Sequence, residues 1–549
     1  MSSLYSYIST PKKEPYSFKS IPDVLSEQTE LYPDLEIIIC RGTDGSRESL
    51  TNKELNEKSR KLAGYLMRNG ICKGDYIAIC GSNSLNRIVA EVGIIASGGV
   101  VVNLTASKYD GSDIIDTMKA TNCKALFIDQ RFNHKSKYSM VLQNIEKSGL
   151  DLSLIVLLSK EQEEAKYLDV AAVLSNDSPC KELPFLDPED PITVYVTSGS
   201  TGNPKLLEMS HFPHVNILES PPPKDRPISY CDRPFGWMGG NVMRAICGKE
   251  IRVFPKLSNE SEELKIDEAI QVMQNEKCNF AFFMPSFIQE LLSLKSKYEG
   301  NFRMKVILSS GYVMKSSLHE VLGTFCDVLL VAYASTETHA ISINGPILPG
   351  QTYVEGDVGL PYPGVEVKVV NNDEQITKRG IPGEICVRSN FISNGFHKSI
   401  KDAPPFMVAN RWVKTGDLGI INDDGRIVIQ GRIKDIICKA GRKYIPSFIE
   451  EPILKLQGIR NVMALAVPDE IVHEEICLCF LSDPHVTEDT VAKYCKDVFC
   501  KEEALQGLSA KPKYYQRFED FPVLANGKPD KRKLKSMAIQ RIKENENTS

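Results

Sequence analysis

The chain has 549 residues, of which 42% are hydrophobic and 25% are charged, and its formal net charge is -5. This composition is that of an ordinary soluble globular protein, large enough for more than one domain, and it excludes a disordered chain. The slight acidity excludes a global basic field that would gather nucleic acid or anionic lipid. We therefore expect small-molecule partners and no nucleic acid.

The pattern of cysteines and the absence of recognisable targeting signals lead us to expect a particular cellular compartment. The fifteen cysteines form no C-x-x-C pair, and Cys477 and Cys479 alternate along an expected strand, which favours packed, reduced thiols. His211 and His214 lack matching ligands, so we expect loop histidines rather than a metal site. Residues 1–20 resemble neither a secretory signal nor a transit peptide, no apolar run is long enough to span a membrane, and the last three residues are not the peroxisomal tripeptide. We expect a cytoplasmic protein without a transmembrane segment, and leave its oligomeric state open.

Taken in chain order, the first informative elements surround a polar loop. The stretch Val92 to Leu104 predicts a buried helix followed by a strand. The β-branched and aromatic run Ile192 to Val196 predicts a strand, and Leu206 to Met209 predicts another. Between them, Thr197 to Lys205 combines hydroxyls, glycines and one lysine without the P-loop spacing. Because glycine lets backbone N–H groups converge on an anion, we expect a phosphate-binding hairpin loop, with a solvated turn as the alternative.

From residue 267 to residue 337 the helix and strand patterns alternate. We expect helices at 267–277, 286–297 and 315–324, and strands at 280–284, 306–308 and 328–333. This order predicts βαβ units and a parallel sheet, in which ligands lie beyond the carboxyl ends of the strands. The segments Ser309 to Tyr312 and Ala334 to Glu337 both fall at such ends.

After Gly350 the pattern changes to short strands with Pro/Gly turns, which predicts a β-rich lobe. A domain boundary is expected near Gly431 to Asp435, which follows a strand at 427–430. Beyond it, helices at 447–456 and 488–498 and strands at 462–467 and 476–481 predict a compact α+β unit. The predicted fold is α/β: a large N-terminal domain, residues 1–432, of parallel-rich sheets with helices plus the β-rich lobe, and a small mobile α+β C-terminal domain, residues 433–549.

Five short strings carry a resemblance to a known family. They are TSGSTGNPK at 197–205, YASTE at 333–337, TGD at 415–417, GRIKD at 431–435 and NGK at 526–528. In this order and with these separations, the chain resembles the adenylate-forming, acyl-activating superfamily, and is most like an acyl-CoA synthetase. The superfamily also includes peptide-synthetase adenylation domains and beetle luciferase.

Activation of a carboxylate by ATP brings two anions together, so cations must neutralise the encounter. The resemblance implies that Lys528 contacts both the carboxylate and the α-phosphate, and that Thr336 hydrogen-bonds the α-phosphate. It also implies that Glu337 is a magnesium ligand together with Thr201, as suits a hard cation. Taken alone, Lys528 could be a solvated lysine of the basic tail, and Glu337 a helix-capping acid.

The resemblance further implies a nucleotide site. Tyr333 offers a flat face for adenine, although taken alone it would more often be core; Asp417 can accept from the ribose hydroxyls, and Arg432 can donate to the sugar or the phosphate. The alternative for Thr415 to Asp417 is a plain turn. The full set of expected ATP-binding residues is Thr197, Ser198, Gly199, Ser200, Thr201, Gly202, Lys205, Ser310, Gly311, Tyr312, Tyr333, Ala334, Asp417 and Arg432.

A second half-reaction is implied by the same resemblance. The C-terminal domain is expected to swing about Lys434 so that a thiol attacks the acyl-AMP, with Lys439, Ala440 and Gly441 on the coenzyme A side. The expected acyl pocket contains Trp237, Met238 and Gly239, with Trp237 in place of a histidine common in coenzyme A ligases. The alternative for Trp237 is a buried core residue. Further departures from the family pattern are Ala334, Tyr312, Cys438 and Phe448, of which the last two bear on thioester formation.

The expected function is that of an ATP-dependent, AMP-forming acid-thiol ligase. It would convert a fatty or small organic acid into acyl-AMP and then into a coenzyme A thioester, with ATP, Mg²⁺ and coenzyme A as cofactor or co-substrate. One alternative is an enzyme that loads an amino or hydroxy acid onto a carrier protein. A luciferase-like oxidation and a non-catalytic binder of nucleotide or acyl ligand are more remote.

Overall fold

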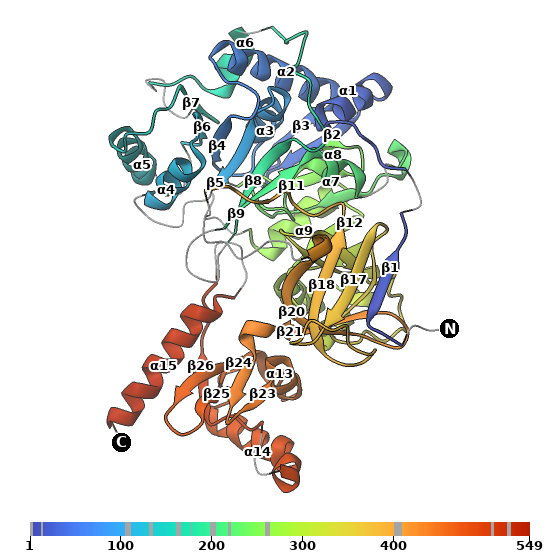
Figure 1. Cartoon of the computed structure of the whole chain (residues 1–549), viewed down its shortest axis with the longest axis vertical. Coiled ribbons are helices and arrows are strands. Elements are labelled where there is room, and N and C mark those ends of the chain that lie inside the picture. Colours follow the sequence, from blue (N-terminus) through green and yellow to red (C-terminus); the bar gives the residue numbers. More distant parts are fainter. Residues whose placement is uncertain are drawn as a thin grey trace.

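The structure is a computed structural model that describes residues 4–12, 15–104, 111–130, 135–160, 166–176, 178–197, 205–217, 221–257, 264–399, 409–506, 510–523 and 529–548. Three sheets organise these residues, with 14, 7 and 5 strands. Figure 1 shows the two larger sheets and their helices in one body, with the last sheet and helices α13 to α15 below them. The α/β class predicted from the sequence is confirmed by the shared fold of known structures described below.

The 7-stranded sheet lies between two groups of helices. Along strand β4, Ile77 and Ile79 pack into a core with α2 and α3, whereas Ala78 and Cys80 pack toward α4 and α5. Both faces are therefore buried, as is usual for parallel strands. The predicted helix and strand between Val92 and Leu104 are confirmed as α3 and β5. In spatial order the strands are β19 (Gly395–Phe396), β9 (Lys205–Ser210), β8 (Pro191–Thr197), β5 (Val100–Leu104), β4 (Tyr76–Cys80), β6 (Ala125–Ile128) and β7 (Leu154–Leu157).

The 14-stranded sheet is parallel from β14 to β2 and antiparallel elsewhere. Its spatial order is β1 (Tyr7–Thr10), β17 (Val365–Val370), β18 (Gly383–Ser389), β20 (Val413–Ile421), β21 (Ile427–Arg432), β16 (Asp357–Pro361), β15 (His339–Ile343), β14 (Cys326–Ser335), β13 (Met304–Ser309), β12 (Phe280–Phe283), β10 (Ile228–Tyr230), β11 (Ile251–Pro255), β2 (Glu36–Arg41) and β3 (Arg47–Thr51). The β-rich segment after Gly350 is therefore not a separate sheet. Strand β14 joins it to the parallel part, because its first half pairs with β13 and its second half with β15.

The helices of the part before residue 433 have the following bounds: α1 (Ile21–Leu31), α2 (Asn52–Arg68), α3 (Leu85–Ala96), α4 (Ser112–Thr121), α5 (Lys135–Lys147), α6 (Val170–Asn176), α7 (His211–Asn216), η1 (Pro223–Asp225), α8 (Met243–Ile246), α9 (Ile266–Asn275), α10 (Pro285–Ser293), α11 (Lys295–Tyr298), η2 (Ser316–Glu320), α12 (Val321–Thr324) and η3 (Ala409–Arg411). Two predicted helices differ from this. The one expected at 286–297 is divided between α10 and α11, and the one expected at 315–324 is a 3₁₀ turn followed by a kink. Gly323 has a φ of +82° there, which ends any regular helix.

The 5-stranded sheet confirms the elements predicted beyond Asp435. Its strands are β23 (Arg442–Tyr444), β22 (Ile437–Lys439), β25 (His473–Ser482) and β24 (Ile459–Asp469), with β26 (Tyr514–Phe518) also paired to β25. Helices α13 (Pro446–Leu454), α14 (Glu488–Gln506) and α15 (Lys531–Thr548) accompany it, and a 3₁₀ turn, η4 (Ile433–Asp435), precedes it. Figure 1 shows α15 along one side of this part, running down to the C-terminus, and α14 at the bottom.

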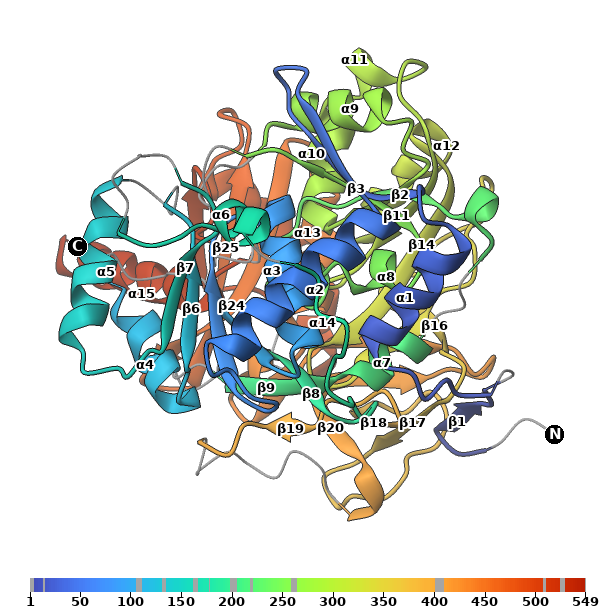
Figure 2. The same cartoon turned by 90° about the horizontal axis from the view of Figure 1, so that it is seen from above.

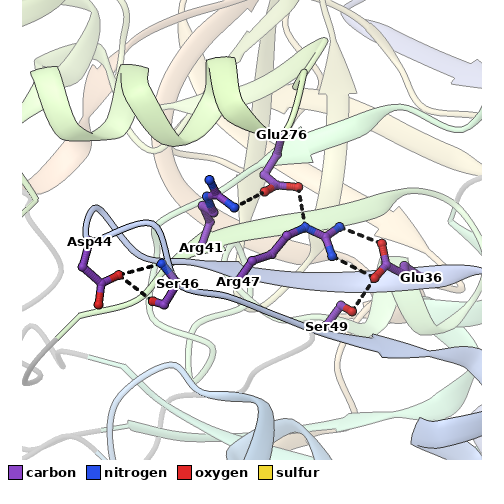
Figure 3. Close-up of polar contacts among 7 residues, drawn as sticks. All are labelled: Glu36, Arg41, Asp44, Ser46, Arg47, Ser49 and Glu276. Carbon is purple, nitrogen blue, oxygen red and sulfur yellow. Dashed lines mark hydrogen bonds and ion pairs between the residues drawn. The ribbon is translucent and has the colours of Figure 1, made fainter.

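A charged network fixes the β2–β3 hairpin to the end of helix α9. In Figure 3, Arg47 lies between the carboxylates of Glu36 and Glu276, and Arg41 also contacts Glu276. The two nitrogens Nη1 and Nη2 of Arg47 donate to Glu36 at 2.9 and 2.7 Å. Because Glu276 follows α9, this network holds the hairpin beside that helix, where Figure 2 shows the hairpin projecting.

Most of the described thiols are buried in this fold, and so are the two histidines singled out from the sequence. Among the described residues, fourteen cysteines are free thiols, and Cys477 and Cys479 are both buried on β25, as the sequence predicts. The expectation of loop histidines is wrong, because His211 and His214 lie in α7 and are almost fully buried. No group of three or more potential metal ligands occurs within the described ranges. In those ranges no helix is long and apolar enough to cross a membrane.

Candidate active site

The predicted phosphate loop connects two antiparallel strands. Thr197 is the last residue of β8, Lys205 is the first of β9, and the two are paired in register. Residues 198–204, including Thr201, lie outside the described residues. The Lys205 ammonium is 5.2 Å from the centre of the Phe396 ring on the neighbouring β19. The strands on both sides thus form the hairpin that the sequence predicts, while phosphate binding by its loop stays a prediction.

Two of the predicted motifs follow neighbouring parallel strands. Ser310, Gly311 and Tyr312 come directly after β13, and Gly311 has a φ of +106°, a value that favours glycine. The Tyr312 hydroxyl interacts with Ser286 at the start of α10, and burial raises the pKa of this phenol. Thr336 and Glu337 follow the end of β14. The carboxyl ends of β12, β13 and β14 therefore meet at one edge, as the alternating pattern predicts.

Three side chains that are far apart in the sequence meet beside this edge. The Tyr333 hydroxyl donates a hydrogen bond to the carboxylate of Asp417, and the Arg432 Nε lies 2.8 Å from the other oxygen of that carboxylate. Asp417 on β20 and Arg432 on β21 are paired in register, which explains how the two residues come together. Burial and the neighbouring carboxylate raise the pKa of Tyr333 well above its ordinary value. The tyrosine is therefore a hydrogen-bond donor at neutral pH.

The TGD segment is not a plain turn. Thr415, Gly416 and Asp417 lie inside β20, and Gly416 adopts a φ of +71°. The Thr415 hydroxyl accepts from the Asp417 N–H at 3.1 Å, and the Gly416 N–H donates to Glu384 at 3.2 Å. Glu384 was not among the residues predicted from the sequence, because nothing in its own segment sets it apart. These bonds fix the backbone that presents the Asp417 carboxylate.

The Thr336–Glu337 pair lies in the tight turn between β14 and β15. Ser335 Oγ accepts from the Thr338 N–H at 3.2 Å, and the carbonyl of Glu337 accepts from the Ser393 N–H at 3.1 Å. Glu337 is not a helix-capping acid, since the chain continues directly into a strand. Its half-buried carboxylate is a hard oxygen donor of the kind that Mg²⁺ prefers, so this part of the proposed metal site fits its ion.

The expected acyl-pocket residues occupy turns that follow β10. Trp237 is half-buried rather than part of the core, and its carbonyl accepts from the N–H groups of Gly240 and Asn241. A Cβ on Gly239 would be 3.9 Å from the Phe282 ring of β12. Arg233 was not singled out from the sequence. Burial raises the pKa of the Tyr312 phenol and the charge of Arg233 opposes this, while the Nη1 of Arg233 is 3.5 Å from the Met284 sulfur. The position of Arg233 just beyond the carboxyl end of the parallel strand β10 could have indicated a residue of the site.

The residues expected to act in the second half-reaction belong to the C-terminal part. Lys434 lies in η4, and burial lowers the pKa of its ammonium. Ala440 and Gly441 form the two-residue turn between β22 and β23, with φ values of +48° and +77°. Lys439 is held by an ion pair of 2.7 Å with Glu475. Lys528 lies outside the described residues.

Polar contacts join the C-terminal part to the large sheet. Lys315, after β13, forms an ion pair of 2.8 Å with Glu450 on α13. The Ser447 hydroxyl donates to the Gln430 carbonyl at 2.9 Å. Attraction by Glu450 and Glu355 raises the pKa of Lys315 in spite of burial, which acts in the opposite direction. The side chain is therefore charged at neutral pH.

Comparison with known proteins agrees with this geometry. A family model described as AMP-binding enzyme matches residues 25–397. The human medium-chain acyl-CoA ligase ACSF2, a mitochondrial protein, is 24% identical over 96% of this chain and 89% of its own length. The putative acyl-CoA synthetase YngI of Bacillus subtilis is 24% identical over 95% of this chain and 97% of its own.

Solved structures show the same fold. The anthranilate CoA ligase AuaEII in complex with anthranoyl-AMP superimposes with a TM-score of 0.79 at 16% identity, over 96% of this chain and 99% of that one. ATP-bound MatB from Rhodopseudomonas palustris gives a TM-score of 0.77 at 18% identity, over 95% of this chain and 100% of that one. The fold, the motifs and the family match define an ATP-dependent, AMP-forming ligase. The chain belongs to the family of AMP-binding enzymes.

Proposed function

We propose that the protein is an acyl-CoA synthetase acting on a fatty or other organic acid. In the first step a carboxylate oxygen attacks the α-phosphorus of ATP, the bond to the β-phosphate oxygen breaks, and acyl-AMP and pyrophosphate are formed. In the second step the thiol of coenzyme A attacks the acyl carbon, loses its proton and displaces AMP. The observation that carries the proposal is the meeting of Tyr333, Asp417 and Arg432 beside the carboxyl ends of the parallel strands.

The residues of this edge suit a nucleotide. The Asp417 carboxylate is proposed to accept from ribose hydroxyls with the lone pairs that Tyr333 and Arg432 do not use, and Arg432, half of whose side chain is exposed, is proposed to donate to the sugar or the phosphate. Tyr333 and Ala334 with Ser310, Gly311 and Tyr312 are proposed to surround the base. Thr336 is proposed to donate to the α-phosphate. The loop from Thr197 to Lys205 is proposed to hold the other phosphates.

Magnesium is proposed to bind at Glu337, with the Thr201 hydroxyl and phosphate oxygens of ATP as further ligands. When bound, it would neutralise phosphate charge as the carboxylate approaches. Lys528 is proposed to supply the remaining positive charge at the α-phosphate. It would also contact the attacking carboxylate.

Thioester formation is proposed to require movement of residues 433–549 as a domain relative to residues 1–432. Lys434 is the proposed hinge, since it lies in the short turn between β21 of the 14-stranded sheet and β22 of the 5-stranded sheet. The turn of Ala440 and Gly441 would then face the thiol. Coenzyme A is the proposed acceptor, in keeping with the names of the relatives.

A different acceptor is the second candidate. One solved structure of the same fold is the amide bond synthetase McbA, which matches with a TM-score of 0.76 at 20% identity. Its name indicates that the fold serves acceptors other than a thiol. The other acceptor weighed from the sequence is the thiol of a carrier protein; Phe448, 56% exposed on α13, is an apolar side chain that such a protein partner can contact.

Pyrophosphate exchange into ATP across a panel of carboxylic acids, with and without coenzyme A, tests both steps. We expect exchange with at least one acid and a thioester product when coenzyme A is added. Exchange without a thioester would replace coenzyme A by another acceptor. An absence of both AMP and pyrophosphate release would refute the function.

Lys528→Ala tests the proposed catalytic lysine. We expect adenylation to fall by about 100-fold to 1,000-fold, equivalent to about 3 to 4 kcal/mol, while the affinity for ATP stays within about tenfold. The matched control is Lys533→Ala, an exposed lysine of the same basic segment. Equal activity of the two variants would remove the role of Lys528.

The cytoplasmic location and a part in fatty acid metabolism are also proposals. Some relatives carry the word mitochondrial in their names, whereas a bacterial relative does not. Cell fractionation with an antibody to the native protein would decide between the cytosol and the mitochondrion.

A further inference from the structure

In strands β12, β13 and β14, one face of the parallel sheet is apolar and partly exposed. Side chains alternate between the two faces of β12, β13 and β14. On one face Ala281, Phe283, Ile307, Leu329 and Val331 are buried in the core with α9 and α10. On the other face Met304 and Cys326, at the starts of β13 and β14, are buried, and the side chains beyond them are only partly buried. We call this partly buried part the half-exposed face; it consists of Phe280, Phe282, Val306, Leu308, Val328, Leu330 and Ala332.

The half-exposed face leads to the active site. Along β14 it continues from Ala332 to Ala334, which is followed by Thr336 and Glu337. From Val328 to Ala334 the strand rises six positions, or about 20 Å at ~3.3 Å per residue. The face is thus long enough for an extended acyl chain whose reacting carboxylate lies at Thr336 and Glu337. Partly exposed apolar side chains in that position gain stability when an apolar chain covers them.

An arginine lies at the end of this face that is formed by Phe280, Val306 and Val328. The guanidinium of Arg244, on α8, lies 5.9 Å from the centre of the Phe280 ring. The Arg244 side chain is 32% exposed, and its Nη2 is 3.2 Å from Glu250. Its Nε is buried and has no hydrogen-bond partner among the residues that the structure describes. Arg244 therefore retains donors that can bind a ligand.

The surroundings of Arg244 carry more positive than negative charge. Glu250 is shared with Arg252, whose Nη2 is 2.5 Å away. Lys249 is almost fully buried, and its Nζ donates to the backbone carbonyls of His214 and Val215. Burial lowers the pKa of Lys249 to about 8, so it is still mostly protonated at neutral pH. Three cations against the one carboxylate of Glu250 leave a surplus of two positive charges within this described group.

The other titratable groups that face Arg244 do not offset this surplus. Burial lowers the pKa values of His214 and His339, to about 4 for His339, so both imidazoles are neutral at neutral pH. The pKa of the buried Tyr362 phenol is raised, so it carries no charge either. A positive charge in a partly desolvated site is costly unless an anion neutralises it. An anionic ligand group is therefore favoured there.

We propose that the acyl substrate lies along the half-exposed face and that Arg244 binds a second carboxylate at its far end. The substrates would then be acids with a carboxylate at each end, and Arg244 would be a specificity-determining residue. This inference rests on the proposed function, because it assigns the substrate class of the same active site. A guanidinium can hold a carboxylate through two parallel hydrogen bonds, which also fixes the length of chain that fits.

The test compares acids of equal chain length with one or two carboxylates. For the purified full chain, kcat/KM is measured for pairs of mono- and dicarboxylic acids of increasing length, with pyrophosphate release as the readout. We expect the unmodified protein to prefer the dicarboxylate at its best length. We expect Arg244→Met to lower kcat/KM for that dicarboxylate by about 30-fold or more, and to leave the monocarboxylate within about threefold. Arg244→Lys should restore part of the preference.

Arg303→Met is the matched control, because it removes an ion-paired arginine that is exposed next to Asp327. It should leave the ratio between the two acids unchanged. The inference is overturned if the unmodified protein prefers monocarboxylates at all lengths, a result that does not depend on whether Arg244→Met folds. It is also overturned if Arg244→Met raises KM for ATP or coenzyme A instead, since the anion would then be a phosphate. If no acid releases pyrophosphate, the proposed function itself fails.

Discussion

Lys315 and Glu450 form an ion pair of 2.8 Å that joins the large sheet to helix α13. Both side chains are mostly buried, and Glu450 also accepts a hydrogen bond of 3.0 Å from the Ala464 N–H. A movement of the C-terminal part about Lys434 would have to break this pair. The pair therefore stabilises the arrangement of the two parts seen in Figure 1.

A double-mutant cycle measures that contribution. We expect Lys315→Met and Glu450→Gln each to destabilise the protein, and the pair to show a coupling free energy of about 1 to 3 kcal/mol in thermal unfolding. The control cycle uses the exposed pair Lys297 and Asp267, for which we expect about 0 to 1 kcal/mol. Additive effects at Lys315 and Glu450 would show that the contact carries no net stabilisation.

Asp417→Asn tests the carboxylate beside the proposed ribose site. The substitution removes the negative charge that attracts Arg432 and weakens a charge-assisted hydrogen bond from Tyr333. We expect KM for ATP in pyrophosphate exchange to rise by about tenfold or more, with a smaller change in KM for the acid. Asp424→Asn, an exposed residue in the turn between β20 and β21, is the control. An unchanged KM for ATP would exclude Asp417 from nucleotide binding.

Gly441→Ala separates the two half-reactions. Gly441 has a φ of +77°, and no atom of the described residues beyond its chain neighbours lies within 4 Å of the position that a Cβ would take. Alanine would therefore cost backbone strain of about 1 kcal/mol without a clash. We expect slower thioester formation and unchanged pyrophosphate exchange. Gly380→Ala is the matched control, since Gly380 has a φ of +76° and equally open surroundings among the described residues. Equal effects of both variants on thioester formation would indicate a general loss of stability.

The hydrogen bonds of Glu36 to Arg47 predict an acid-dependent stability. Arg47 lowers the pKa of Glu36 from 4.5 to about 2. A carboxyl with a lowered pKa contributes stability above its unfolded value, and this contribution is lost as the pH falls from about 4.5 toward 2. Because the Glu36 side chain is 39% exposed, solvent screening limits the effect to about 1 kcal/mol or less.

Urea unfolding at a series of pH values checks this. We expect the midpoint of Glu36→Gln to fall less steeply between pH 5 and about 3 than that of the unmodified protein, and the two curves to differ most near neutral pH. Glu48→Gln, which affects an exposed ion pair at the same hairpin, is the control. Parallel curves for Glu36→Gln and the unmodified protein would contradict the expected role of this carboxylate.

Local patterns in the sequence were sufficient to predict most of the parallel strands and the edge, formed by their carboxyl ends, at which a ligand is expected. The strands on both sides of Thr197 and Lys205 and those before Ser310 and Tyr333 are all apolar runs followed directly by polar residues. Such runs are recognisable because a strand that is buried on both faces of its sheet needs apolar side chains on both. The order of the strands then places their carboxyl ends together.

Long-range contacts could not be predicted in the same way. The bond between Tyr333 and Asp417 depends on β20 and β21 continuing the large sheet, which the short strands after Gly350 do not specify. Arg244 gave no signal either, because its importance comes from its position over Phe280 rather than from its neighbours in sequence. The kink at Gly323 replaced a predicted helix for a related reason: one residue with positive φ overrides the periodicity of the residues around it.

Consecutive residues of strand β14 have different structural roles. Val328, Leu330 and Ala332 belong to the half-exposed face, Leu329 and Val331 belong to the core, and Tyr333 binds Asp417. Insertion or deletion of a single residue in this strand would exchange all of these positions at once. Within β14, the half-exposed face can therefore be altered by substitution at every second position, with the length of the strand kept constant.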